Sequence, residues 1–100
     1  MLVTVDIGNT NITIGIFDKD ELIGTYRLTT KVRRTSDEYG FMLKNFLDRS
    51  NVHEKQIEAV IVSSVVPKVM HSFTNGIKKF VGIEPLIVGP GIKSGISVQL

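Results

Sequence analysis

A short polar cluster lies between two runs of β-forming residues near the start of the sequence, in VTVDIGNTNITIGIF, residues 3–17. Its members are Asp6, Gly8, Asn9, Thr10 and Asn11. A carboxylate can hold Mg²⁺, directly or through water. Glycine lets the backbone approach a ligand closely, the polar side chains offer donors, and consecutive turn N–H groups bind anions. A metal-binding acid beside a phosphate-binding turn is what phosphoryl transfer from ATP requires.

The same residues are also typical of a plain β-hairpin turn, because Gly, Asn and Asp tolerate the positive φ values that such turns need. Taken alone, Asp-x-Gly-Asn favours this simpler interpretation. Its place directly after the first strand, and before a second apolar strand at 12–17, favours a ligand site. Both interpretations stay open at this point.

The remaining sequence predicts the elements that position this cluster. Alternating and β-branched residues predict strands at 2–7, 12–17 and 22–28. Apolar residues at three- and four-residue steps predict a helix over 37–49, and Thr35 with Glu38 predicts a capping box at its start. A buried strand at 58–64, a helix from Pro67 to Val81, a strand at 84–88 and a glycine-rich loop at 89–95 follow.

This order, β-β-β-α-β-α-β, predicts an α/β domain with a mixed sheet, in which an antiparallel meander leads into parallel crossovers. If the first strand lies parallel to the fourth, their carboxyl ends share one edge of the sheet. Asp6 would then meet Ser63 and Ser64 there. Alternation puts Asp6 on a face with Leu2 and Thr4, and we expect that face, and both faces of the fourth strand, to be buried.

The composition is that of one soluble domain, with 100 residues, 42% of them hydrophobic and 22% charged. The net charge of +2 comes from scattered residues, so a nucleic-acid or membrane surface is not required. The absence of cysteine excludes disulfides and thiolate metal sites, and two histidines are too few for a zinc site. No apolar run is long enough to span a bilayer, and we expect a cytoplasmic protein.

Four motifs together resemble the N-terminal part of type III pantothenate kinase. They are DIGNTN at 6–11, RRTSDEYG at 33–40, SSVVP at 63–67 and GPGIKSGI at 89–96. The resemblance implies a ribonuclease H-like, actin-like ATPase fold. It implies phosphorylation of pantothenate to 4'-phosphopantothenate by ATP, the first step of coenzyme A biosynthesis. It also implies a homodimer that needs Mg²⁺ and a monovalent cation, K⁺ or NH₄⁺.

The resemblance also assigns residues to the site. The implied ATP-phosphate loop consists of Asp6, Ile7, Gly8, Asn9, Thr10, Asn11, Ile12 and Thr13, with Asp6 at the Mg²⁺. The residues implied to flank the substrate cleft are Ser63, Ser64 and Val65. For the two serines, capping of the following helix is an equal alternative. For Arg33, Arg34 and Thr35, a solvated helix start is favoured over contact with substrate phosphate or a partner subunit.

One departure from the family pattern concerns the chemistry itself. The family's Gly-Ala-Asp-Arg motif supplies the general base, and this sequence does not contain it. Leu100 stands where some members present a tyrosine to the substrate. We therefore expect residues 1–100 to be an N-terminal portion of the enzyme, without its second domain and inactive alone.

Two other functions remain open. A metal-dependent nuclease of the same topology would use carboxylates on the first strand, the first helix and the end of the fourth strand. Asp37 or Glu38 could be the helix member, but the fourth strand ends in Ser63 and Ser64. A non-enzymatic nucleotide-binding regulatory module is the second alternative, because a phosphate loop without a base can bind without reacting.

Overall fold

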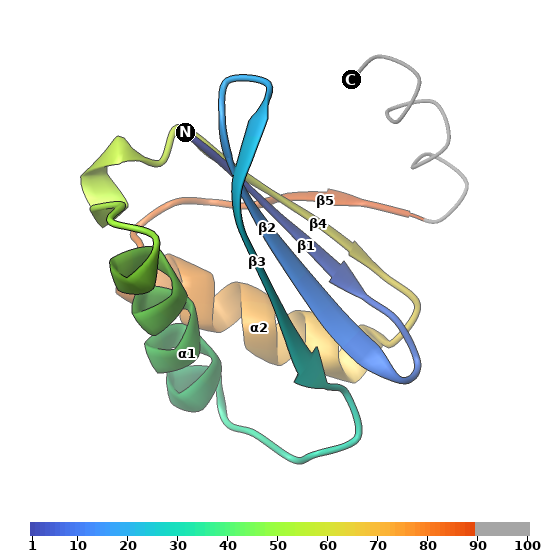
Figure 1. Ribbon diagram of the computed structural model, residues 1–100. Coiled ribbons are helices and arrows are strands. Elements are labelled where there is room, and N and C mark those ends of the chain that lie inside the picture. The colour runs from blue at the N-terminus through green and yellow to red at the C-terminus, as the bar shows by residue number, and fades with distance from the viewer. Residues whose placement is uncertain (90–100) are drawn as a thin grey trace.

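The computed structural model describes residues 1–89, which form a mixed sheet with two helices (Figure 1). The elements are β1 (Leu2–Ile7), β2 (Asn11–Asp18), β3 (Glu21–Thr29), α1 (Ser36–Arg49), η1 (Glu54–Gln56), β4 (Ala59–Ser64), α2 (Pro67–Phe80) and β5 (Leu86–Val88). The predicted order is confirmed, and η1, a short 3₁₀ helix, is the addition. The glycine-rich loop predicted at 89–95 lies outside the described residues beyond Gly89.

The five strands are arranged in the order β3-β2-β1-β4-β5. β1 pairs antiparallel with β2 and parallel with β4, as predicted, so Asp6 lies between Thr13 on one side and Ser63 on the other. The carboxyl ends of β1, β3, β4 and β5 and the start of β2 therefore lie along one edge of the sheet. The polar segments singled out from the sequence all leave the sheet at this edge.

The core lies between one face of the sheet and the two helices, which Figure 1 shows side by side. Alternate residues of β1 face the helices and are buried: Val3, Val5 and Ile7. Tyr39 of α1 and Phe73 of α2 meet in the centre with their ring centroids 4.9 Å apart. This contact holds both helices on the same side of the sheet.

The helices approach closely at two buried glycines, Gly40 and Gly76. A Cβ added at Gly76 would lie 2.5 Å from the carbonyl oxygen of Ser36, which is closer than real Cβ atoms come. Gly76, which the sequence marks only as a weak helix former, is therefore what allows this helix packing.

α1 begins at the predicted capping box. The Thr35 hydroxyl accepts a hydrogen bond from the Glu38 N–H, and the Glu38 carboxylate accepts one from the Thr35 N–H at 2.7 Å. Two backbone donors that the helix leaves unpaired are thereby satisfied.

The prediction that Asp6 interrupts a buried face is wrong for the described residues, because Asp6 is exposed. Both helices pack against the Val3 side of the sheet, so the side that carries Asp6 has no covering layer from residues 1–89. For the same reason β4 is not buried on both faces: Ala59 and Ile61 on the outer face are only half-buried. Within this part of the chain, neither helix is long and apolar enough to span a membrane.

Candidate functional site

The site is built on the tight turn between β1 and β2. The Gly8 N–H donates to the Asn11 carbonyl at 2.9 Å, which closes the turn. Asn9, Thr10 and Asn11 are exposed, so their amide and hydroxyl groups are available to a ligand. A Cβ at Gly8 would lie 3.3 Å from the Asn11 carbonyl oxygen, closer than ordinary contact. The residues make a hairpin turn, as the simpler interpretation has it, and this turn presents the polar groups to solvent.

Thr30, just beyond β3, holds this turn from the side. Its N–H donates to the Thr10 carbonyl at 2.9 Å, and its hydroxyl donates to the Gly8 carbonyl at 2.8 Å. The side chain is 5% exposed. Thr30 thus binds the carbonyl groups of both residues that flank Asn9, and these two hydrogen bonds restrain the turn. Sequence reasoning missed Thr30, because only the register of β2 against β3 brings it beside the turn.

Asp6 lies at the end of β1, on the sheet face opposite the helices and next to Ser63 of β4. Among residues 1–89, no three His, Cys, Asp or Glu side chains gather into a group that could enclose a metal ion. Mg²⁺, however, usually keeps several waters and is held by one or two carboxylates together with substrate phosphates. The exposed Asp6 carboxylate, at the end of β1 just before the polar turn, is a donor that suits Mg²⁺ in that form.

The three residues predicted to flank a cleft differ in their hydrogen bonds, their exposure and the face of the sheet on which they lie. Neither serine caps α2, because its N-cap residue is Val66 and receives no side-chain cap. The Ser64 hydroxyl instead accepts from the Val66 N–H at 2.8 Å, which orders the turn before the helix. The Val65 N–H donates to the Ile7 carbonyl at 3.0 Å, which fastens this turn to the end of β1 and leaves the Val65 side chain exposed. Ser63 is buried on the Asp6 side of the sheet. Only Ser63 thus shares a face with Asp6.

The segment between β3 and α1 contains the predicted basic residues. Arg34 donates from Nη1 to the Thr29 carbonyl at 2.8 Å and lies over the Tyr39 ring, 5.8 Å from its centroid. Thr35 is the helix cap, as described above, while the Arg33 side chain is exposed. Arg34 and Thr35 therefore have structural roles, and Arg33 keeps its charge in solvent.

The acids that a nuclease would need on α1 are engaged elsewhere. Asp37 accepts from Lys79 of α2 at 2.8 Å, and Glu38 completes the capping box. With no three-member acidic group in residues 1–89, this part of the chain lacks the carboxylate set of a two-metal nuclease.

Solved structures share this fold at low sequence identity. ROK hexokinase from Thermus thermophilus matches with a TM-score of 0.65 and 15% identity, over 88% of this chain and 33% of that one. RuvC from T. thermophilus, solved with a Holliday junction substrate, matches with a TM-score of 0.52 and 15% identity, over 90% of this chain and 64% of that one. These likenesses confirm the actin-like, ribonuclease H-like fold and say nothing further about function.

Sequence comparison identifies the family. A curated type III pantothenate kinase from Bifidobacterium longum is 56% identical over 100 residues, which are 100% of this chain and 39% of the relative. The chain therefore spans well under half the length of the curated relatives that it matches. A sequence model described as type III pantothenate kinase matches residues 2–100. The chain belongs to the type III pantothenate kinase family.

Proposed function

We propose that this chain is the N-terminal, ATP-phosphate-binding domain of an enzyme that transfers the γ-phosphoryl group of ATP to pantothenate and forms 4'-phosphopantothenate. Membership of the family supports the reaction and its place in coenzyme A biosynthesis. The observation that carries the role of this domain is the turn between β1 and β2, whose exposed polar residues are fixed by Thr30 beside the Asp6 carboxylate.

In this proposal the loop Asp6–Thr13 binds the phosphates, with Gly8 allowing close approach and Asn9, Thr10 and Asn11 donating hydrogen bonds. Asp6 holds Mg²⁺ through its carboxylate. When bound, the ion neutralises the charge on the phosphate oxygens and orients the γ-phosphoryl group. Ser63, which is buried on the same face beside Asp6, would contact the substrate. The general base comes from the rest of the protein.

The proposal extends to the family's other requirements. We also propose a monovalent cation, K⁺ or NH₄⁺, a homodimer and a cytoplasmic location, as the resemblance to the family implies. Pantothenate and ATP are the proposed substrates, and neither nucleic acid nor a membrane is a proposed partner.

The test is pantothenate-dependent turnover of ATP by the full-length protein, with 4'-phosphopantothenate identified by mass spectrometry. Full-length protein should form the product, and residues 1–100 alone should not. If the full-length protein binds ATP equally with and without pantothenate in calorimetry and forms no product, the proposal is wrong and the regulatory module takes its place.

A further inference from the structure

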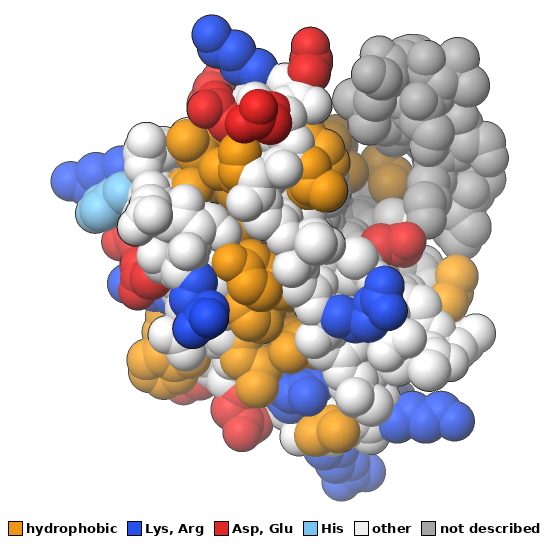
Figure 2. All heavy atoms as spheres, viewed as in Figure 1, with side chains coloured by type: hydrophobic (Ala, Val, Ile, Leu, Met, Phe, Trp, Pro, Cys, Tyr) orange, Lys and Arg blue, Asp and Glu red, His pale blue; other side chains and the backbone are white. Residues whose placement is uncertain are grey.

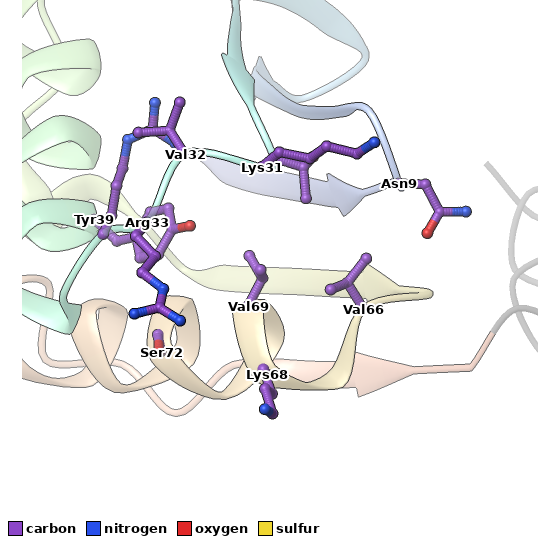
Figure 3. Close-up of a pocket in the computed structure, with 11 residues that line it drawn as sticks. Asn9, Lys31, Val32, Arg33, Tyr39, Val66, Lys68, Val69 and Ser72 are labelled. Carbon is purple, nitrogen blue, oxygen red and sulfur yellow. The ribbon is translucent and has the colours of Figure 1, made fainter.

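A second feature at the same end of the sheet is a basic pocket with a cavity volume of about 560 Å³. It lies between the segment that follows β3 and the first turns of α2 (Figure 3). This volume falls within the range of small-molecule sites, roughly 300 to 1,000 Å³. The residues that line it are Asn9, Thr30, Lys31, Val32, Arg33, Arg34, Tyr39, Val66, Lys68, Val69 and Ser72.

The lining is charged with one sign only. Four residues are cationic, Lys31, Arg33, Arg34 and Lys68, and none is acidic. Arg34 is committed to the Thr29 carbonyl, but within residues 1–89 no ion pair involves the other three. Lys and Arg side chains also gather at the corresponding lower end of the surface in Figure 2. Cations placed together without an anion repel one another, and a bound anion would relieve that repulsion.

Part of the pocket lining is apolar. Val66 and Val69 project from the start of α2 into the space below Lys31, and Tyr39 closes one side (Figure 3). Arg33 reaches across toward Ser72, which adds a hydroxyl group. Val66 and Val69 are only partly buried by the core, so apolar surface remains for a ligand. The pocket thus combines an apolar floor with several separated hydrogen-bond donors of positive charge.

The pocket is distinct from the site at Asp6. It is lined by α1 and α2 and so lies on the helix side of the sheet, whereas Asp6 is on the opposite face. The turn between β1 and β2 separates the two, with Asn9 at the rim of the pocket and Thr30 in its lining. A molecule in the pocket would therefore bind behind the turn, without using Asp6.

We propose that this pocket binds a small organic phosphate, with its phosphoryl group at Arg33 and Ser72 and its apolar part on Val66 and Val69. Arg and Lys are the usual phosphate-binding side chains, and the planar guanidinium of Arg33 can donate to two oxygens of one phosphoryl group while the Ser72 hydroxyl donates to the third. A carboxylate, with one charge and two oxygens, would leave that hydroxyl without an acceptor.

The test uses the full-length protein and isothermal calorimetry in buffer with EDTA, so that metal-assisted binding at Asp6 is suppressed. The probes are phenyl phosphate, inorganic phosphate and benzoate. Phenyl phosphate should bind tightest, because only it offers both a phosphoryl group and an apolar body. Phenyl phosphate affinity should fall about tenfold in Arg33→Gln, since a tenfold change corresponds to about 1.4 kcal/mol for the charged hydrogen bonds lost. It should fall less in Lys68→Gln, because the Lys68 amino group points away from the space between Lys31 and Val69 (Figure 3).

The matched control is Lys55→Gln, an exposed lysine in η1 that removes the same charge away from the pocket. Its affinity for phenyl phosphate should equal that of the wild type. The proposal is overturned if phenyl phosphate does not bind, as would happen if the rest of the full-length chain fills the pocket. It is also overturned if Lys55→Gln weakens binding as much as Arg33→Gln, or if benzoate binds as tightly as phenyl phosphate. Because Arg33 and Lys68 are both exposed, their replacement should leave thermal unfolding unchanged. A protein inactive on pantothenate could still bind phenyl phosphate, so the two proposals fail separately.

Discussion

Thr30 makes two hydrogen bonds to the turn between β1 and β2, which is the proposed phosphate loop, and Thr30→Val tests whether they hold it in shape. Valine has nearly the same size and shape as threonine but lacks the hydroxyl that donates to the Gly8 carbonyl at 2.8 Å. The backbone hydrogen bond from Thr30 to Thr10 is retained. The substitution therefore removes one of two attachments and leaves the packing in place.

The expected effect follows from the surroundings of the Gly8 carbonyl. A buried carbonyl left without a donor costs about 1–3 kcal/mol, and Gly8 is half-buried, so water can replace the lost donor in part. We therefore expect the lower value, about 1 kcal/mol, which corresponds to about a fivefold change in an equilibrium. If the fixed turn is the form that binds ATP phosphates, kcat/KM for ATP should fall about fivefold.

The assay is steady-state kinetics of the full-length protein, with ATP varied at saturating pantothenate and then pantothenate varied at saturating ATP. KM for pantothenate should stay unchanged, since the turn is proposed to contact only the nucleotide. Thr30→Ser keeps the hydroxyl and should restore activity. Thr29→Val is the matched control, because the neighbouring Thr29 side chain is exposed and makes no hydrogen bond within residues 1–89. The reasoning is refuted if Thr30→Ser is as impaired as Thr30→Val, or if Thr29→Val is equally impaired.

Two further predictions concern stability. Gly76→Ala should lower the midpoint of denaturant unfolding, because its Cβ would lie 2.5 Å from the Ser36 carbonyl oxygen. Overpacking costs about 1–3 kcal/mol, against a gain of about 1 kcal/mol in helix propensity. The control is Asn75→Ala, which should not destabilise the protein because Asn75 is exposed. Equal unfolding midpoints for Gly76→Ala and Asn75→Ala would contradict the close helix contact. The N-terminal ammonium, 2.9 Å from Glu58, lowers the pKa of that carboxyl below its usual 4.5 by a hydrogen bond and by charge attraction. A depressed pKa contributes stability above pH 4.5 that is lost as the pH falls through the folded pKa, so Glu58→Gln should melt slightly lower than wild type near neutral pH. The difference should vanish in acid, and a difference that persists there would show another cause.

Local patterns predicted the elements and the place of the loop. The capping box at Thr35 and Glu38 depends on residues three apart, and the parallel pairing of β1 with β4 follows from the order of the elements. The capping box follows a local spacing rule and the strand pairing follows a topological rule, and both rules can be applied to a single sequence. The hairpin at Gly8 was equally readable, because its residue types are those that such turns require.

Features that depend on strand register, or on which face of the sheet the helices cover, could not be predicted from the sequence. Alternation separates Asp6 from Val5, but it does not say which face the helices cover, and the exposure of Asp6 follows from that choice. Thr30 reaches the turn only through the pairing of Asn11 with Thr29. Lys31 and Lys68 line one pocket although they are far apart in the sequence.

The most direct test of the central claim is the activity of Asp6→Asn in the full-length protein at a fixed Mg²⁺ concentration. Asparagine keeps the shape of the side chain and removes the charge that is proposed to hold the metal ion. Stabilisation of charge by a metal is worth several kcal/mol, so pantothenate-dependent ATP turnover should fall by about a hundredfold or more. Asp18→Asn, at the exposed far end of β2, removes the same charge and should retain wild-type turnover. Wild-type turnover in Asp6→Asn would contradict the proposal that this loop is the metal-assisted phosphate site.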